Sequence, residues 1–571
     1  MTATAPPRET AHHGGRILLD TVRHNAGRTL TLALLATAGT AAALALPAVL
    51  GHTLDLLLAR RDAEAGRWVL LCAALVGLPV VLDALDELLT ATTAARTTAW
   101  LRHRSLGHVL AAGPQATARI PAGDLVTRLV GNAAHAGTAP ASLAGTLAAL
   151  AAPLGGIVAL ALTDWWLAVA FLAGAPVLAV LLRSFARASA DSLTGYQRLQ
   201  GEIAGRLVEA LGGARTIAAA GTTGRERARV LAPLDGLAEH GHRMWKVQGR
   251  ATAQAATLVP LLQIVVLAVA GYELSRARLS VGEVLAASRY AVLAAGIGTL
   301  VGHLNSLVHG RTAARRLAEV HALAPVPYGT LRLPPGGDGT LRLRGVSAVR
   351  GGRQVLHGVD LTVPGGTTLA VVGRSGTGKS VLAAVAGRLA DPDAGEVTLD
   401  GVALRDLTRE ELRAAVGYAF ARPALLGGTM GGTVAFGSFA PDRDAVVAAA
   451  RAACADDFIR KLPEGYGTAC AAAPLSGGEV QRLGLARAFA HAGRLLVLDD
   501  ATSSLDSVTE AKVAGALLQD VAARTRLVVA HRPSTAARAD RVAWLDDGRV
   551  RAVGTHAELW RLPGYRAVFA E

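Results

Sequence analysis

Long apolar stretches with few charged residues dominate roughly the first 320 residues of this 571-residue chain. The apolar stretches cover residues 29–57, 68–90, 138–162, 165–183, 252–272 and 280–303. Each is close to or above the roughly 20 residues that an α-helix needs to cross the hydrocarbon of a bilayer. A single stretch of this kind could be a buried core helix, but six in succession predict six transmembrane helices.

The composition favours a membrane protein over a nucleic-acid-binding protein. Hydrophobic residues make up 51% of the chain, and the formal net charge is +14. Only four residues are lysine, so arginine carries nearly all the positive charge. The arginines are spread over many segments, as in cytosolic loops, and no nucleic-acid partner is expected. The cysteines, Cys72, Cys454 and Cys470, have neither metal-binding nor disulfide spacing.

The distribution of arginine also predicts the orientation in the membrane. The tail 1–28 and the segments 91–137 and 184–251 are rich in arginine, so the positive-inside rule places them in the cytosol. The opposite connections are short, although 58–67 also carries arginines. A basic tail before an apolar run resembles a signal peptide, but 29–57 is too long and further spans follow, so it is expected to remain as a helix. We therefore predict a multi-pass protein of the cytoplasmic (inner) membrane.

The pattern changes after Leu323. A Pro/Gly-rich linker covers 323–339, and beyond it short apolar strands alternate with helical stretches. The predicted fold class is an α-helical six-span transmembrane domain followed by an α/β P-loop domain. The predicted domains are a cytosolic tail (1–28), a transmembrane domain (29–322), the linker and an α/β domain (340–571).

The α/β part contains a P-loop. "GRSGTGKS" (373–380) follows an apolar strand and precedes a helical stretch, the context that G-x-x-x-x-G-K-[ST] requires. Its glycines let backbone N–H groups face phosphate oxygens, Lys379 would neutralise the β- and γ-phosphates, and Ser380 would ligate Mg²⁺. The residues predicted to bind ATP here are Gly373, Arg374, Ser375, Gly376, Thr377, Gly378, Lys379 and Ser380.

Further motifs follow in a fixed order. They are "LSGGEVQR" (475–482), "LLVLDD" (495–500), "SSLD" (503–506) and "VVAHR" (528–532), with "GDLVTRL" (123–129) in the membrane part. Together they resemble the exporter branch of the ABC transporters, in which "LSGGE" is the signature, "SSLD" the D-loop and "VVAHR" the switch-histidine segment. The resemblance covers the chain from about residue 25 to its end. The segment 482–506 looks like half-transporters found beside actinobacterial peptide natural-product genes, including those of lanthionine-containing peptides.

The resemblance implies a mechanism in which two cassettes close around two ATP molecules. Each site uses the P-loop of one chain and the signature of the other, so a second half-transporter is an expected partner, together with membrane lipid and a transported substrate. The implied residues are Ser476, Gly477, Gly478, Glu479 and Asp506 for ATP, Ser380 and Asp499 for Mg²⁺, and Asp500 and His531 for catalysis.

Four positions depart from the family pattern. Asp500 stands where the family usually has Glu, and Ala421 where it usually has Gln. Arg350 replaces the aromatic residue that stacks on adenine, although a guanidinium can also stack on a base. Ala472 stands where exporters often have an acid before the signature. Asp500 and Ala421 together favour an ATP site that binds but hydrolyses poorly, and hence an asymmetric heterodimer whose partner carries the Glu.

Two alternatives remain open at this stage. The departures could be drift at tolerant positions in a homodimeric multidrug or lipid exporter, or the chain could be a non-transporting membrane ATP sensor. No peptidase domain precedes the spans, so cleavage of a leader peptide by this chain is not expected.

The membrane part contains ionisable residues that could line a substrate path. Asp83, Asp86 and Glu87 are spaced i, i+3 and i+4 and share one face of a helix. They could instead lie on a cytosolic helix extension and pair with arginines such as Arg96. Arg289 falls inside the sixth predicted span and is expected to face a cavity, because charge at membrane depth is costly.

Overall fold

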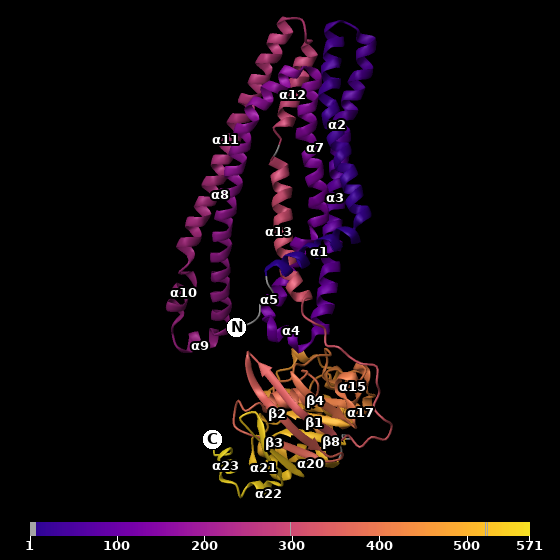
Figure 1. Cartoon of the computed structure of the whole chain (residues 1–571), viewed down its shortest axis with the longest axis vertical. Helices are drawn as coiled ribbons and strands as arrows, with labels where there is room; N and C mark the ends of the chain where they lie inside the picture. The colour runs from indigo at the N-terminus through magenta and orange to yellow at the C-terminus, as the bar shows by residue number, and fades with distance from the viewer. Residues whose placement is uncertain (1–6, 297, 520, 522–523, 571) are drawn as a thin grey trace. The chain divides into compact units, whose positions relative to one another are not determined.

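A computed structural model describes residues 7–296, 298–519, 521 and 524–570. The chain forms two compact units. One contains Pro6–Leu106 and Gly123–Val320, and the other combines Gly107–Ala122 with His321–Glu571. Figure 1 shows the helical first unit and the α/β second unit.

The first unit is built from long helices (Figure 1). Helices α7, α8, α11 and α12 share an apolar core that includes Leu160, Phe171 and Tyr290, and α8 runs beside α11. The described elements of this unit are α1 (Pro7–His24), α2 (Ala26–Leu58), α3 (Asp62–Ala112), α5 (Ala122–Thr127), the π-helical turn η1 (Arg128–Asn132), α6 (Ala133–Gly137), α7 (Ala139–Thr163), α8 (Trp165–Gly212), α9 (Ala214–Ala219), α10 (Thr223–Leu231), α11 (Leu234–Ser275), α12 (Val281–Ala294) and α13 (Gly298–His321).

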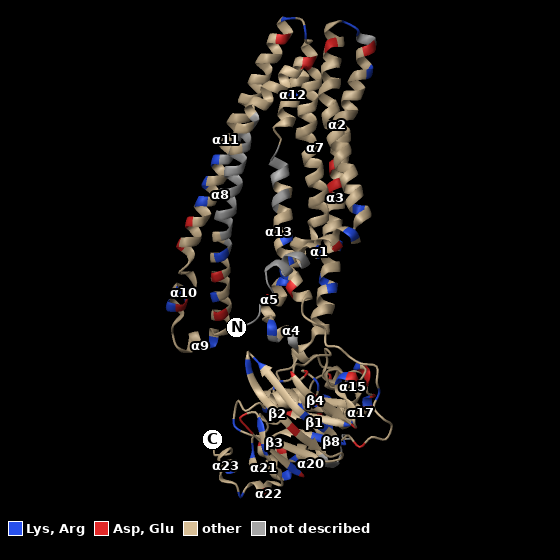
Figure 2. Cartoon of the chain, in the orientation of Figure 1, with Lys and Arg blue, Asp and Glu red and all other residues tan. Residues whose placement is uncertain are grey.

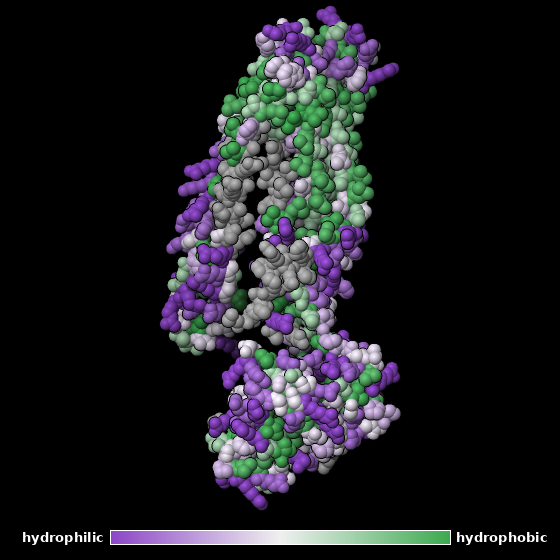
Figure 3. Space-filling model, viewed as in Figure 1, coloured by the Kyte–Doolittle hydropathy of each residue, from purple (hydrophilic) through white to green (hydrophobic). Residues whose placement is uncertain are grey.

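Four helical stretches among the described residues are long and apolar enough to cross a membrane. They are 26–58, 64–112, 122–163 and 223–275. The first three include the predicted spans 29–57, 68–90 and 138–162, and the last includes 252–272. The predicted span 165–183 lies in α8, which opens with the shorter apolar stretch Trp165–Gly174. Figure 3 shows broad apolar surface on this unit, and Figure 2 shows long uncharged stretches on its helices. The count of six spans stays a prediction.

The prediction of one continuous helix over 280–303 is wrong. Helix α12 ends at Ala294 and α13 begins at Gly298. The junction contains Gly296, and glycine destabilises a helix interior by about 1 kcal/mol relative to alanine. Arg289 is exposed on α12 in this unit.

The acidic face of α3 has a mixed environment. Asp83 and Glu87 are exposed and Asp86 is half-buried. Their role in a substrate path stays a prediction.

The second unit contains two sheets. The six-stranded sheet has the order β10-β9-β3-β8-β7-β6, and the four-stranded antiparallel sheet has the order β2-β1-β4-β5. Strands β6, β7, β8, β3 and β9 are parallel. The strands are β1 (Leu341–Arg350), β2 (Arg353–Val363), β3 (Thr368–Val372), β4 (Ala394–Leu399), β5 (Val402–Ala403), β6 (Val416–Phe420), β7 (Leu495–Asp499), β8 (Thr525–Val529), β9 (Arg541–Asp546) and β10 (Arg549–Gly554).

Helices cover the parallel sheet, so its central strands can be apolar on both faces. Accordingly, every residue of β3 and β8 is buried. The helices of this unit are α4 (Pro114–Arg119), α14 (Lys379–Ala386), α15 (Arg409–Ala415), α16 (Met430–Val434), α17 (Arg443–Ala452), α18 (Asp456–Arg460), α19 (Gly477–Ala490), α20 (Ser507–Gln519), α21 (Pro533–Arg538), α22 (His556–Leu559) and α23 (Pro563–Ala567). The predicted fold class, helical membrane domain followed by α/β domain, is confirmed.

The segment predicted as a linker is bound to the α/β unit by its backbone. Leu331 N donates to Asp406 O at 2.8 Å. Near the start of the segment, Val326 N donates to Ala111 O at 3.1 Å, which ties it to the end of α3. Hydrogen bonds therefore hold the segment 323–339, called the strap below, in place.

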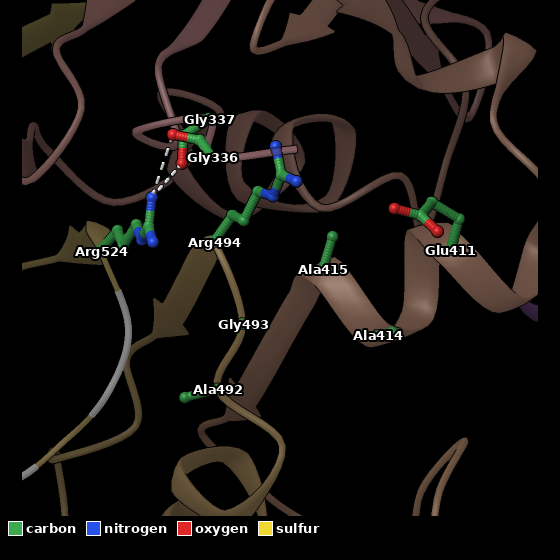
Figure 4. A pocket seen from close by; sticks show the side chains of 9 residues that line it. All are labelled: Gly336, Gly337, Glu411, Ala414, Ala415, Ala492, Gly493, Arg494 and Arg524. Atoms are coloured by element: carbon green, nitrogen blue, oxygen red, sulfur yellow. Dashed lines mark hydrogen bonds between the residues drawn. The ribbon is translucent and has the colours of Figure 1, made fainter. Parts of the chain in front are cut away.

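A buried carboxylate anchors the far end of this strap. Asp400 accepts hydrogen bonds from Gly339 N at 2.7 Å and from Arg494 Nη1 at 2.6 Å. Arg524 donates to the carbonyl of Gly337, and these arginines line a shallow cavity beneath the strap (Figure 4). The cavity lies among structural hydrogen bonds, away from the predicted P-loop residues.

Candidate functional site

The predicted P-loop connects the carboxyl end of β3 to the start of α14. Gly376 and Gly378 have φ angles of 81° and 98°, a left-handed region that favours glycine. Gly378 is the N-cap residue of α14, directly before Lys379. Backbone N–H groups at such a helix start attract anions, so the loop is suited to hold phosphate.

Lys379 is folded into this loop. Its Nζ donates to Gly373 O at 2.7 Å and to Arg374 O at 2.9 Å. Burial lowers the pKa of Lys379, and the carboxylates of Asp500 and Asp499 oppose that change. The ammonium group therefore lies among the backbone carbonyls of the loop and close to two acids.

Asp499, the last residue of β7, is half-buried and hydrogen-bonded. Its Oδ1 accepts from Ser380 Oγ at 2.9 Å, and its Oδ2 accepts from Tyr418 Oη at 3.4 Å. Burial raises the pKa of Asp499, and the hydroxyl donors oppose this. A carboxylate and a serine hydroxyl at this separation fit the oxygen ligands that Mg²⁺ prefers.

The second acid, Asp500, has a different geometry. Its φ is 52°, a left-handed conformation that aspartate tolerates better than most side chains. Its Oδ1 lies 4.0 Å from Nε2 of His531, beyond hydrogen-bonding distance. His531 follows β8, which pairs with β7, so the ends of neighbouring strands bring both predicted catalytic residues to the P-loop edge.

The other departures from the family pattern occupy separate places. Ala421 follows β6, and its carbonyl accepts a hydrogen bond from Gln481 Nε2 at 3.0 Å. Arg350 ends β1, and its guanidinium lies 3.6 Å from the carboxylate of Asp393. Ala472 is exposed at the end of a 3₁₀ turn, Cys470–Ala472.

The signature segment forms the N-terminus of α19. Ser476 is the N-cap, and Glu479 completes a capping box in which Ser476 N donates to Glu479 Oε2 at 2.8 Å. This backbone hydrogen bond lowers the pKa of Glu479. The space around the Cα of Gly477 is open, whereas Gly478 lies near the backbone of Ser504.

The predicted D-loop leads into α20. Asp506 Oδ2 accepts from Thr509 N at 3.0 Å and from Val508 N at 3.1 Å. Hydrogen bonding from Thr509 lowers the pKa of Asp506. In the described chain this residue therefore caps a helix.

Sequence reasoning missed Gln481, although it lies inside "LSGGEVQR". This residue is only 1% exposed and bonds to several motifs. Its burial could have been expected, because Gln481 lies four positions before the apolar Leu485 and seven before Ala488, a spacing that puts all three on one face of a helix.

The comparisons with known proteins agree with this architecture. The ABC transporter transmembrane region matches residues 29–295, and the ABC transporter cassette family matches 356–503. The ABC transporter ATP-binding protein RamA of Streptomyces coelicolor is 57% identical over 520 residues, which cover 91% of this chain and 81% of RamA. The chain belongs to the ABC transporter family.

More distant ABC transporters are also similar. The ATP-dependent lipid A-core flippase of Chromohalobacter salexigens is 33% identical over 70% of this chain and 69% of the flippase. A multidrug efflux ATP-binding/permease protein of Mycobacterium tuberculosis is 34% identical over 69% of this chain and 34% of that protein. The solved structure of a bacterial Atm1-family ABC exporter with ATP bound has a TM-score of 0.80 and 25% identity, covering 96% of this chain and 98% of that one.

These similarities confirm the predicted exporter-type ABC half-transporter. The chain is an ATPase coupled to transport, it binds ATP through its cassette, and its helical domain spans a membrane. Half-transporters of this kind act together with a second chain and move a substrate across the membrane.

Proposed function

We propose that this ABC transporter is one half of an asymmetric heterodimer that exports a peptide natural product, and that its own ATP site hydrolyses slowly. The observation that carries the proposal is the pairing of Asp500 with Ala421 beside a P-loop that keeps all its expected residues. Phosphate binding and water activation have separate requirements, and only the second is reduced here.

Asp500 is poorly suited to activate water. Its carboxylate is one methylene closer to the backbone than that of Glu, and it lies 4.0 Å from His531. A misplacement of about 1 Å can cost roughly 100-fold in rate. Ala421 cannot compensate, because it has no side-chain amide and its carbonyl already accepts from Gln481.

The signature of the same chain supports the other half of the proposal. Its N-terminal turn is ordered by the Ser476–Glu479 capping box. A partner that carries Glu at the position of Asp500 would hydrolyse ATP at the site completed by this signature. In the chain's own site, Ser380 and Asp499 would hold Mg²⁺, which offsets phosphate charge. The N-terminus and the cassette would lie on the cytosolic side of the cytoplasmic membrane.

The proposed substrate rests on the resemblance of segment 482–506 to half-transporters found beside peptide natural-product genes. A homodimeric lipid or multidrug exporter is the second candidate, favoured by the similarity to the lipid A-core flippase and to the multidrug efflux protein.

The decisive test compares the purified chain alone with its complex with a partner half-transporter that carries the Glu. Both are reconstituted in lipid nanodiscs, and ATP hydrolysis is measured. We expect the complex to be at least about 10-fold faster, in line with a misplaced carboxylate in the chain alone. A Glu→Gln substitution in the partner should remove the difference. A chain that alone hydrolyses ATP as fast as the complex would contradict the heterodimer.

The substrate is tested in inside-out vesicles that contain the complex. ATP-dependent uptake of a labelled lanthionine-containing peptide is expected, with little movement of a labelled lipid. The reverse preference would favour the lipid exporter, and the absence of any substrate-stimulated ATPase activity would favour an ATP sensor.

A further inference from the structure

One buried side chain connects several motifs of the cassette. Gln481 Nε2 donates to Ala421 O at 3.0 Å and to Ser503 Oγ at 3.0 Å, and its Oε1 accepts from Ser504 N at 2.9 Å. The carbonyl of Asp500 lies 3.5 Å from the same Nε2. Gln481 is 1% exposed, so water cannot replace these partners.

These contacts fix the orientation of the amide. A primary amide has two N–H donors and one carbonyl acceptor, and here each faces a partner of the opposite kind. If the amide were rotated by half a turn, its NH₂ group would face the N–H of Ser504 and its oxygen would face the carbonyl of Ala421. One orientation of the Gln481 amide therefore makes all of these hydrogen bonds, and the bonds fix the distance between α19 and the segments that they reach.

The bonded segments belong to different parts of the ATP machinery. Ala421 and Asp500 are two of the departures in the chain's own site. Ser503 and Ser504 belong to the D-loop, and Gln481 is in the helix that begins with the signature. Buried, close-packed groups transmit displacement, because each can move only with its neighbours. A shift at Ala421 or Asp500 must therefore move α19 or break these hydrogen bonds.

We propose that Gln481 is a positioning residue that couples the chain's own ATP site to the signature it presents to the partner's ATP. The proposal rests on the asymmetric heterodimer proposed above. In this proposal, ATP bound at the slowly hydrolysing site sets the position of Ser476 and of the first turn of α19. The coupling runs through the backbone carbonyl of Ala421. This carbonyl is present although residue 421 lacks the side chain of the Gln that the family usually has there.

The test uses the complex with the Glu-bearing partner. Gln481→Met keeps the side-chain length and removes the hydrogen bonds. We expect kcat for ATP to fall about fivefold to tenfold, a size typical of coupling between sites. KM should stay within about twofold, because Gln481 is not among the residues proposed to hold ATP.

A control variant separates coupling from a general loss of stability. Tyr466→Phe removes another partly buried hydrogen bond of the cassette, from Tyr466 Oη to Asp456 Oδ1 at 2.8 Å. It should leave kcat within about twofold of the parent, while lowering the melting temperature about as much as Gln481→Met does. If Tyr466→Phe lowers kcat as much as Gln481→Met, the positioning role is wrong.

A double variant tests the coupling directly. Lys379→Ala empties the chain's own site, and in that background Gln481→Met should lower kcat by less than about twofold further. If the fold-changes in kcat of Lys379→Ala and Gln481→Met multiply in the double variant, the two residues act independently and the coupling is wrong. If Gln481→Met does not fold, Ser503→Ala decides, because it removes one hydrogen bond through an exposed side chain and should lower kcat about threefold or more, beyond the change in the Tyr466→Phe control. A kcat of Ser503→Ala within about twofold of the parent would then overturn the proposal.

The two proposals fail in different ways. Full ATPase activity of the chain alone removes the asymmetric heterodimer and the coupling with it. Multiplying effects in the complex remove only the role of Gln481.

Discussion

The P-loop and the water-side residues of this cassette share one edge of a sheet but differ in how fully they follow the ABC pattern. The P-loop keeps its glycines in left-handed conformations, its lysine and its serine. At the same sheet edge, Asp500 has a shorter side chain than the usual Glu, and Ala421 lacks the side-chain amide of the usual Gln. The proposed function therefore assigns this chain a site that keeps phosphate binding while its water activation is weakened. The signature resembles the P-loop in this respect, because its glycines and capping serine are kept.

The largest expected effect comes from the signature. Gly477→Asp places a carboxylate where space is open, at the first turn of α19, so the fold should be retained. The added charge would oppose the γ-phosphate of the partner's ATP. We expect the ATPase activity of the complex to fall on the order of 100-fold, comparable to the loss of a transition-state contact.

The control for this variant is Gly477→Asn, which has the same shape without the charge. It should retain most of the activity. If Gly477→Asn is as inactive as Gly477→Asp, steric blockage explains the loss and the comparison between the two regions is weakened.

A gain of activity is expected on the water side. Ala421→Gln combined with Asp500→Glu restores both missing groups, and hydrolysis by the chain alone should rise about 10-fold, part of the loss attributed to a misplaced carboxylate. The gain should be incomplete, because Glu at φ 52° carries more backbone strain than Asp. The measurement is steady-state ATPase activity in nanodiscs.

Asp500→Asn provides the opposite control. It is isosteric and removes the negative charge, so it should change the activity of the complex by less than about twofold if the partner's site does the hydrolysis. A large loss would show that Asp500 is catalytic as it stands.

The motifs with local geometry could be predicted from the sequence. The P-loop and the acid pair are each set by residues close together in the chain, and the structure places them at a helix start and a strand end as expected. The break between α12 and α13 was missed because the hydropathy of 280–303 is continuous, while the weakening effect of Gly296 on the helix is local.

Contacts between distant segments could not be predicted in the same way. The pairing of Arg350 with Asp393 and the bonds of Gln481 join residues up to about 60 positions apart, and no periodicity encodes them. The strap over 323–339 was also unexpected, because a Pro/Gly-rich composition gives no sign of the buried Asp400 that anchors it.

The smallest expected effect concerns the base of ATP. Arg350→Tyr would supply a ring for stacking on adenine in place of a guanidinium held 3.6 Å from Asp393. That ion pair is partly exposed and contributes little to stability, so the fold should tolerate its loss. Aromatic stacking is worth about 0.5–1.5 kcal/mol, or roughly twofold to tenfold in affinity. We expect the lower end, about threefold tighter binding at the chain's own site, because a guanidinium can itself stack on a base. The measurement is ATP affinity by competition with a fluorescent nucleotide, with Mg²⁺ omitted to prevent hydrolysis. Arg350→Ala should bind slightly more weakly than the parent. If Arg350→Tyr binds ATP no better than Arg350→Ala, residue 350 does not contact the base. The departures that affect the chain's own ATP site would then be confined to Asp500 and Ala421.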